Sequence, residues 1–186
     1  MFIPESYRRL KRGPQVILPK DIGVIIAYTG VGKNSTCVDA GTGSGWLAVS
    51  LARVCKHVTS YDVREDFMRI AEHNMRTEGL DNLTLKLGDV TKRIDEKDVD
   101  LVTLDFAGSE KAVRNAHKAL KLNGCICGYL PHMEQVKSFV SKLEKFNFRN
   151  VIVLEIIARD MLVRKEGMRP STKGVWHTAY LAFAQK

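Results

Sequence analysis

Apolar and polar positions along the chain follow two periodicities that take turns from residue 35 onward. Short runs that are nearly all apolar, or apolar at every second residue, predict strands at 35–40, 57–62, 82–89, 100–105, 124–130, 151–159 and 175–186. Apolar residues at helical spacing predict helices between them, at 44–55, 64–80, 109–120 and 133–146. Ser109 is the expected N-cap of the third of these helices.

The alternation of strands and helices predicts an α/β fold, in which helices cover both faces of a parallel sheet. The last two strand patterns have only a loop between them, so we expect them to close a mostly parallel, seven-stranded sheet with a C-terminal antiparallel strand. Ligands of such sheets bind at the carboxyl ends of the strands. We expect one domain over 1–186, with 1–14 as a short basic N-terminal extension.

Composition limits the setting in which this domain works. Hydrophobic residues make up 45% and charged residues 27% of the 186 positions, as in ordinary globular proteins. No apolar run approaches the roughly 20 residues of a membrane span, and the N-terminus lacks the apolar core of a signal peptide. The four cysteines form no CxxC pair and have no histidine at zinc spacing. We therefore expect a cytoplasmic protein with no membrane contact and no metal.

Positive charge is in excess and gathers in three places. The sequence has 29 Lys and Arg against 21 Asp and Glu, a formal net charge of +8. The clusters are Arg8, Arg9, Lys11 and Arg12; Lys111, Arg114, Lys118 and Lys121 along one side of a predicted helix; and Arg159, Arg164, Lys165, Arg169 and Lys173 between the last two strands. Three such clusters on one basic domain favour an RNA partner.

A glycine-rich turn, Gly41-Thr42-Gly43-Ser44-Gly45, follows the first predicted strand and the acid Asp39. The dinucleotide fingerprint G-x-G-x-x-G does not match, because the third glycine comes one residue early, and no Gly-Lys-Ser/Thr of a P-loop follows. Backbone N–H groups free of side chains, without an anchor for pyrophosphate, suit S-adenosylmethionine better than NAD. A purely structural turn and a dinucleotide site are the alternatives.

Two further acids extend this series. Asp62 ends the second predicted strand, where a carboxylate accepts hydrogen bonds from both hydroxyls of a ribose. Asp89 ends the third, where it would take an adenine amino group. The alternatives are a helix N-cap and a turn aspartate. Together with the glycine turn, these acids predict a Rossmann-like class I methyltransferase that uses S-adenosylmethionine.

From Arg12 onward, the chain resembles the tRNA adenine-N1 methyltransferases that modify position 57 or 58 in the T-loop. The matching segments occur in the order found in that family: RGPQVILPKD (12–21), VDAGTGSGWLAVSLA (38–52), SYDVRED (60–66), LGDV (87–90), LVTLD (101–105), GYLPHMEQV (128–136) and HTAYLA (177–182). The resemblance implies S-adenosylmethionine as cofactor, tRNA as substrate and a homotetramer.

The resemblance also implies roles for single residues. Residues 41–45 match the cofactor cradle, Asp62 the ribose acid and Asp89 the acid beside adenine. Gln15 matches a glutamine that helps to close the cofactor pocket. Asp105 matches the acid beside the transferred methyl group, which is the catalytic position. Tyr129, Leu130 and Pro131 match the wall near the target base.

The sequence departs from the family pattern at three points. Members usually carry a small β domain before the RGPQ segment, whereas only residues 1–11 precede it here. Leu18 stands where an aromatic residue is common, and Phe106-Ala107 stands where proline and tryptophan are common. Two alternatives follow: a small-molecule methyltransferase of the same fold, as for a cobalamin precursor, or the catalytic partner of a separate RNA-binding subunit.

The chemistry of adenine N1 is consistent with a carboxylate at position 105. N1 is a neutral lone pair, so it needs no strong base, but methylation makes the ring cationic. A carboxylate close to it stabilises the transition state more than the ground state. Tyr129, Phe106 and Trp176 are candidate stacking surfaces for an extruded base, and His177 is expected to pack in a strand near the site.

Overall fold

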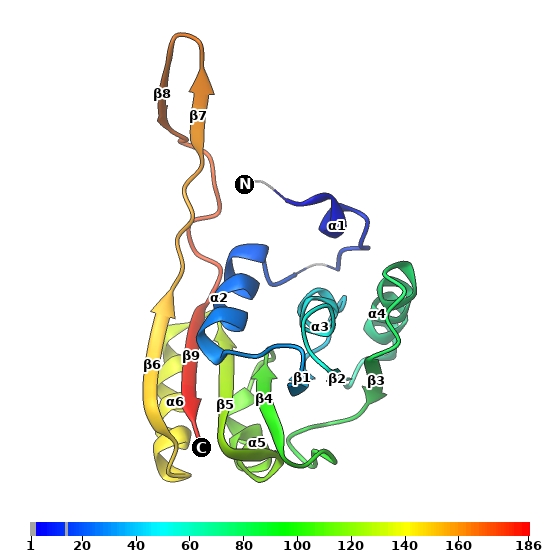
Figure 1. Cartoon of the computed structure of the whole chain (residues 1–186). Helices are drawn as coiled ribbons and strands as arrows, with labels where there is room; N and C mark the ends of the chain where they lie inside the picture. Colours follow the sequence, from blue (N-terminus) through cyan, green and yellow to red (C-terminus); the bar gives the residue numbers. More distant parts are fainter. Residues whose placement is uncertain (1–2, 14) are drawn as a thin grey trace.

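The computed structural model describes residues 3–13 and 15–186, so residues 1, 2 and 14 of the predicted N-terminal extension lie outside it. Its main feature is a seven-stranded sheet with the order β3-β2-β1-β4-β5-β9-β6 (Figure 1). The strands are β1 (Thr36–Ala40), β2 (His57–Asp62), β3 (Leu83–Leu87), β4 (Val99–Leu104), β5 (Leu120–Leu130), β6 (Arg149–Glu155) and β9 (Tyr180–Gln185).

Strand directions confirm the predicted topology. β1 to β5 pair in parallel, and β9 lies antiparallel between β5 and β6. The C-terminal antiparallel strand therefore fills a gap inside the sheet and leaves β6 as the edge strand. Parallel neighbours bring the carboxyl ends of β1, β2 and β4 to one edge, where a ligand site is expected.

Helices cover both faces of the sheet, each with its own hydrophobic core. One face carries α2 (Pro19–Thr29), α3 (Trp46–Ala52) and α4 (Glu65–Thr77), and the other carries α5 (Val113–Ala119) and α6 (Met133–Lys145). Ile22, Leu51 and Leu101 are buried in the first core; Leu104 and Phe139 are buried in the second. Strands buried on both faces explain why the sequence shows near-continuous apolar runs rather than alternation.

Several local details differ from the sequence-based prediction. The helices α1 (Glu5–Arg8) and α2 were not predicted. The prediction that Ser109 is an N-cap is wrong: a 3₁₀ turn, η1 (Ser109–Ala112), precedes α5, and Gly108 occupies the cap position with φ of 80°. Because Gly108 tolerates a left-handed backbone, the chain can enter η1 without a side-chain cap.

Residues 156–179, which we call the arm, connect β6 to β9. The arm contains a hairpin of β7 (Met161–Arg164) and β8 (Gly167–Pro170) that pair only with each other. Figure 1 shows the hairpin standing away from the sheet, on the same side as the N-terminal segment. Met161, Val163 and Met168 on it are more than half exposed. The sequence-based prediction treated only the middle of this segment as a loop. Its predicted strands at 151–159 and 175–186 are too long, because β6 ends at Glu155 and β9 begins at Tyr180.

None of the helices within the described residues combines the length and the apolar character that crossing a membrane requires. No group of three or more His, Cys, Asp or Glu in residues 3–13 and 15–186 is arranged to hold a metal ion.

Candidate cofactor and substrate site

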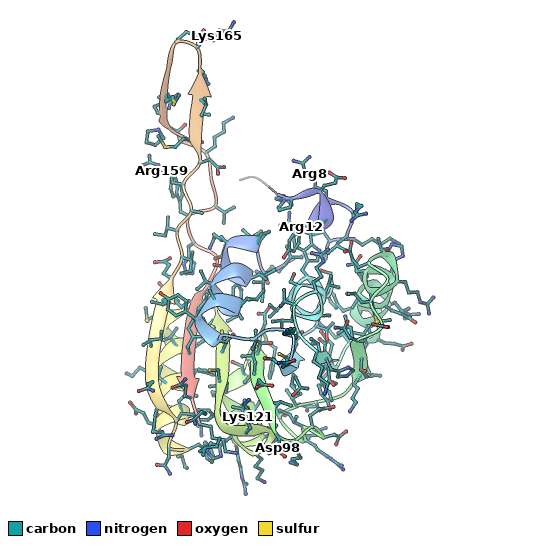
Figure 2. All side chains as sticks on the ribbon, in the orientation of Figure 1. Arg8, Arg12, Asp98, Lys121, Arg159 and Lys165 are labelled. Carbon is teal, nitrogen blue, oxygen red and sulfur yellow. The ribbon has the colours of Figure 1, made fainter. Side chains whose placement is uncertain are left out.

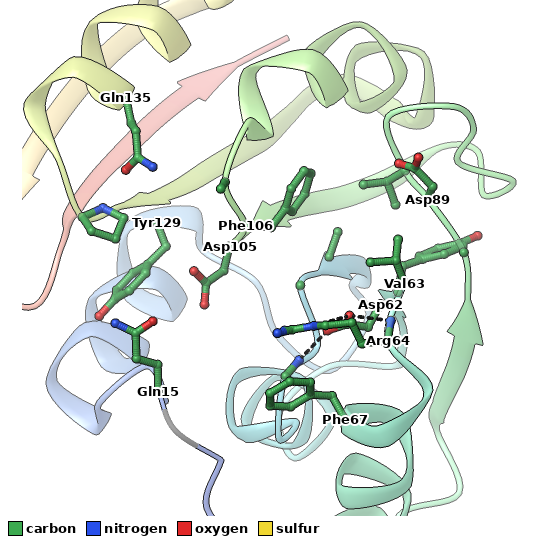
Figure 3. Close-up of a pocket in the computed structure, with 18 of the residues that line it drawn as sticks. Gln15, Asp62, Val63, Arg64, Phe67, Asp89, Asp105, Phe106, Tyr129 and Gln135 are labelled. Carbon is green, nitrogen blue, oxygen red and sulfur yellow. Dashed lines mark hydrogen bonds and ion pairs between the residues drawn. The ribbon is translucent and has the colours of Figure 1, made fainter.

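A cavity of about 580 Å³ opens at the carboxyl ends of β1, β2, β4 and β5 (Figure 3). A smaller space of about 30 Å³ adjoins it and shares Gln15, Gly41, Gly43 and Asp105 with it. The strands β1, β2 and β4 end in Ala40, Asp62 and Leu104, so the residues at or just after these ends face one opening. The sheet itself therefore gathers the predicted acids.

The glycine turn after β1 is held tightly by backbone contacts. Gly41 has φ of 88°, and a Cβ atom placed on it would lie 2.0 Å from the carbonyl oxygen of Asp105. The N–H groups of Gly41 and Thr42 donate to the carbonyl of Tyr61 at 2.9 and 3.1 Å. Only glycine at position 41 lets the turn approach β4 this closely.

The other residues of the turn face different surroundings. Thr42 is buried and its hydroxyl lies 2.7 Å from the hydroxyl of Ser60. Gly45, with φ of 80°, precedes α3, and a Cβ there would lie 3.1 Å from the Cβ of Ala71. Gly45 thus allows α4 to pack closely, and it is not among the residues that line the two cavities.

Both predicted ribose and adenine acids line the larger cavity. Asp62 is buried; its Oδ2 accepts the N–H of Gly43 at 2.9 Å and its Oδ1 accepts the N–H of Arg64 at 3.0 Å. Asp89 accepts from both the N–H and the hydroxyl of Thr91, at 2.9 and 2.6 Å. These hydrogen bonds lower the pKa of Asp89. Each carboxylate is fixed in place and keeps lone pairs for a ligand.

Two acids at the centre of the site, Asp39 and Asp105, have raised pKa values, because their surroundings favour the protonated form. Asp39 is buried and accepts hydrogen bonds from the hydroxyls of Ser60 and Thr103, and burial raises its pKa. Asp105 points into the cavity from the end of β4 (Figure 3). Burial, followed by the charges of Asp39 and Asp62, raises the pKa of Asp105 to about 7.

The wall opposite the cradle comes from the end of β5 and the start of α6. Tyr129, Pro131 and Gln135 line the cavity. Leu130 is buried in the core on the other face of β5 and does not line it. Burial raises the pKa of the Tyr129 hydroxyl, which stays protonated and lies 3.4 Å from the carboxylate of Asp21.

Two of the three aromatic residues predicted to stack on the base lie at the cavity, and the third does not. Tyr129 and Phe106 line the cavity, whereas Trp176 lies on the arm, where the guanidinium of Arg159 sits 5.2 Å from its ring centre. His177 is near the site, beside Pro131, but it precedes β9 and is 41% exposed rather than packed in a strand.

Sequence reasoning missed several residues of the site. Arg64 and Phe67 line the cavity, and the guanidinium of Arg64 lies 3.8 Å from the centre of the Phe67 ring. Arg64 is two residues from Asp62, an acid expected to bind the ligand, and this closeness in sequence could have identified Arg64 as a residue of the site. Gln135 was missed as well; its side chain accepts the N–H of His132 at the start of α6.

Asn74 of α4 ties the N-terminal segment to the glycine turn. Its Oδ1 accepts the N–H of Lys11 at 2.7 Å, and its Nδ2 donates to the carbonyls of Lys11 and Ser44 at 2.8 and 2.7 Å. The indole of Trp46 also donates to the Lys11 carbonyl, at 3.2 Å. Asn74 is fully buried, so these bonds fix Lys11 against the glycine turn.

The residues of the site fit an elongated polar cofactor. The hydroxyl of Ser44 borders the smaller cavity, is buried, and has no hydrogen-bond partner among the described residues. A buried hydroxyl normally has a partner, so it is available to a ligand. The turn excludes a side chain at Gly41, and Asp62 and Asp89 present fixed acceptors along the adjoining larger cavity.

A sheet of this order, with a GxGxG turn after its first strand and acids after the next strands, defines a Rossmann-like class I methyltransferase. Within that class, the chain belongs to the tRNA methyltransferase complex GCD14 subunit family, whose model matches residues 4–174.

Individual relatives agree with this assignment. A protein of Methanocaldococcus jannaschii named tRNA (adenine(57)-N(1)/adenine(58)-N(1))-methyltransferase TrmI is 38% identical, over 96% of this chain and 74% of its own length. The solved tRNA (m1A58) methyltransferase TrmI of Aquifex aeolicus has a TM-score of 0.89 at 27% identity, over 95% of this chain and 72% of its own. A solved SAM-dependent O-methyltransferase of Thermotoga maritima has a TM-score of 0.92 at 33% identity, over 98% and 70%.

Proposed function

We propose that this chain transfers a methyl group from S-adenosylmethionine to N1 of an adenosine in the T-loop of tRNA. The observation that supports this most is the placement of Asp105, between the glycine turn on one side and Tyr129 on the other, inside one cavity. Family membership and the named TrmI relatives supply the substrate class.

The cofactor would be held by residues of the turn and by the two fixed acids. The backbone of Gly41 to Ser44 and the free hydroxyl of Ser44 would contact its amino-acid part, with Gln15 closing the pocket. Asp62 would accept the ribose hydroxyls and Asp89 the adenine amino group. When bound, this cofactor supplies an activated methyl group on a sulfonium.

Asp105 would act on the target base. As a carboxylate it would hold the exocyclic amino group, orient the ring, and stabilise the positive charge that N1 methylation creates. A pKa near 7 means that the anion is present mainly above neutral pH. Phe106 and Tyr129 would flank the base after it has left the T-loop stack.

The basic clusters suggest where the RNA would dock. Figure 2 places Arg8 and Arg12 at the same end of the molecule as Arg159 and Lys165, whereas Lys121 lies at the opposite end. Lys121 also forms an ion pair with Asp100. We assign the phosphate contacts to the N-terminal cluster and the arm, which share their end of the molecule with the carboxyl ends of the parallel strands, and none to α5.

Assembly and location complete the proposal. Ile152 and Val153 on the edge strand β6 are exposed, as are Met161, Val163 and Met168 of the hairpin. Exposed apolar surface next to an unpaired strand edge favours association, and we assign it to a homotetramer in the cytoplasm. A separate RNA-binding subunit is the alternative partner that would bind the exposed surface of the arm.

The test is methyl transfer from labelled S-adenosylmethionine to an unmodified tRNA transcript, followed by identification of the modified nucleoside. We expect label in 1-methyladenosine. Transcripts with uridine at position 57, at 58 or at both are the matched controls, and the label should disappear with the target adenosine. A protein that binds the cofactor by calorimetry but leaves every transcript unlabelled would contradict the proposal.

A further inference from the structure

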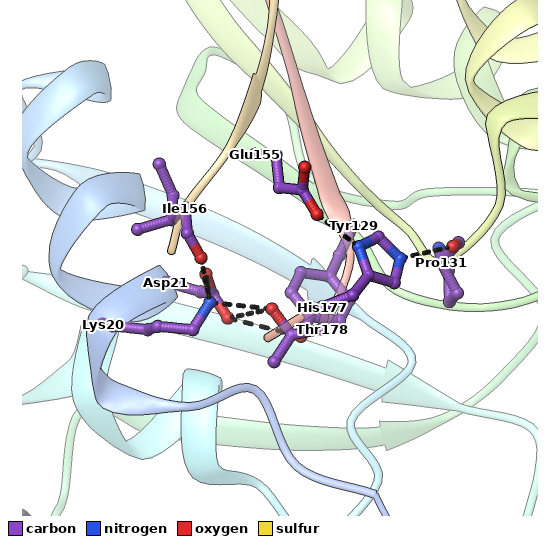
Figure 4. A network of polar contacts seen from close by, with 8 residues as sticks. All are labelled: Lys20, Asp21, Tyr129, Pro131, Glu155, Ile156, His177 and Thr178. Carbon is purple, nitrogen blue, oxygen red and sulfur yellow. Dashed lines mark hydrogen bonds and ion pairs between the residues drawn. The ribbon is translucent and has the colours of Figure 1, made fainter. Parts of the chain in front are cut away.

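The root of the arm is tied to the wall of the cavity by one histidine (Figure 4). His177 Nδ1 lies 2.6 Å from Oε1 of Glu155, at the end of β6. His177 Nε2 lies 2.9 Å from the carbonyl oxygen of Pro131, in the turn between β5 and α6. The imidazole thus spans two segments that are far apart in sequence.

The partners of the ring decide its protonation state. A carboxylate and a backbone carbonyl both accept hydrogen bonds only, so both nitrogens of His177 must carry a hydrogen. Only the imidazolium does. The neutral ring carries only one N–H. That hydrogen stays on Nδ1, where it donates to the charged Glu155, so the lone pair of Nε2 faces the lone pairs of the Pro131 oxygen. Loss of the proton therefore breaks the hydrogen bond to the cavity wall.

On balance, the groups around the His177 ring favour its protonated form. The Pro131 carbonyl and Glu155 raise the pKa of His177, whereas partial burial and the ammonium of Lys20 in α2 lower it. From β9, the Tyr180 ring packs at 4.9 Å between centroids and brings no charge. The hydrogen bond to Pro131 therefore forms below this raised pKa and breaks as the pH rises through it.

Pro131 is part of the surface on which the substrate would rest. Tyr129 and Pro131 line the cavity from the end of β5, followed by His132 and Gln135 from the start of α6. The His132 and Gln135 side chains cap α6 reciprocally, which holds the turn against the start of α6. The hydrogen bond from His177 to Pro131 holds the other side of this turn against the root of the arm.

We propose that protonated His177 is a positioning residue, which holds the Tyr129–Gln135 wall in place for the RNA substrate and links that wall to the arm. The inference rests on the proposed function, since it concerns the tRNA substrate. It assigns His177 no contact with the reacting atoms. Its effect belongs in the KM for tRNA, with the affinity for the cofactor unchanged.

Glu155→Gln is the decisive variant, because it removes the dependence on pH without removing the hydrogen bond to Pro131. A glutamine amide donates to the unprotonated Nδ1 of a neutral ring and leaves Nε2–H for Pro131. Glu144→Gln removes the same charge from an exposed position near the C-terminal end of α6, away from the arm, and is the matched control. NMR titration of His177 and the KM for tRNA between pH 6 and 9 are measured on all three proteins.

We expect the His177 pKa to be raised in the wild type and in Glu144→Gln, and to fall in Glu155→Gln. The KM for tRNA should rise about 3- to 10-fold above that pKa in the first two proteins, as the net contribution of one ordinary hydrogen bond at a partly exposed site implies. It should stay flat in Glu155→Gln.

An unshifted His177 in the wild type, or the same rise in KM in Glu155→Gln, would overturn the inference alone. Absence of methyl transfer at every pH would instead overturn the proposed function, and this inference with it, whatever the NMR titration shows.

Discussion

The cofactor cradle and the arm are both connections between strands, yet they are built in opposite ways. The cradle at 41–45 is pinned by backbone hydrogen bonds to Tyr61, by Asp62 and by contact with Asp105. The arm hairpin pairs only with itself and exposes most of its side chains. Substitutions in a segment with many fixed partners destabilise the fold. Substitutions in an exposed segment leave the fold intact and change only what that segment binds.

The largest effect is expected at Gly41. In Gly41→Ala the new Cβ would meet the backbone of Asp105 at 2.0 Å, so β4 or the turn must move. We expect a loss of about 3–5 kcal/mol in the free energy of unfolding, measured by urea denaturation, together with loss of cofactor binding.

Gly43→Ala is the matched control for this prediction. Position 43 also has a positive φ, of 51°, but the nearest atom to its added Cβ is 3.9 Å away. It should cost only about 1–2 kcal/mol of backbone strain. Equal losses in the two variants would show that close packing against Asp105 is not what makes the cradle rigid.

Asp105→Asn should separate activity from stability. We expect turnover with tRNA to fall about 100- to 1,000-fold, while calorimetry shows cofactor affinity within a few-fold of the wild type. Near-normal turnover would contradict the role assigned to the carboxylate. In the wild type, turnover should fall as the pH drops below 7, because the pKa of Asp105 is raised to about 7.

The same pKa predicts the sign of a stability effect. A carboxyl whose pKa is higher in the folded state stabilises the protein at pH values below its unfolded pKa, and this contribution is lost as the pH rises through about 7. Asparagine does not titrate. Thermal melts should therefore show Asp105→Asn gaining stability over the wild type between pH 4 and 7 and keeping the gain at pH 8. An unchanged difference over this range would mean that Asp105 is well solvated.

The next effect concerns the link between the cradle and the N-terminal segment. Asn74→Ala removes three hydrogen bonds to the backbone of Lys11 and Ser44. We expect a loss of about 2–3 kcal/mol in unfolding free energy, and weaker cofactor binding because the Ser44 turn is less constrained. His73→Ala, at the exposed neighbouring position, should lower neither value, and a similar loss there would show that the three hydrogen bonds of Asn74 are not its cause.

The two regions also differ in how far the sequence predicted them. The strands and their directions were confirmed, because buried parallel strands carry long apolar runs. The predicted acids Asp62, Asp89 and Asp105 lie around one cavity, because the ends of parallel strands meet at one edge of the sheet. Arg64 and Phe67 were missed because their roles depend on which way α4 leaves β2. Asn74 looks like any residue on the buried side of an amphipathic helix, and only the path of Lys11 reveals its role.

The arm escaped prediction for a different physical reason. Its strands are four residues each, and all of their residues except the half-buried Leu162 are exposed, so no alternation of apolar and polar residues marks them. The bridge of His177 depends on a contact between segments about 46 positions apart in sequence, which no local pattern encodes. His177 reaches Pro131 and Glu155 because β9, which follows it, lies between β5 and β6 in the sheet.

The smallest effects are expected from charges on the arm. Replacing Lys165 and Arg169 by glutamine should leave the melting temperature unchanged. It should reduce the slope of log K against log salt for tRNA binding by about 0.7–0.9 for each phosphate that the protein no longer neutralises. The matched pair is Arg114→Gln with Lys118→Gln in α5, at the other end of the molecule (Figure 1). Both pairs remove two positive charges, so a nonspecific charge effect would lower the slope equally in both. A drop confined to the arm pair would show that RNA meets the exposed arm of the protein while the rigid cradle holds the cofactor.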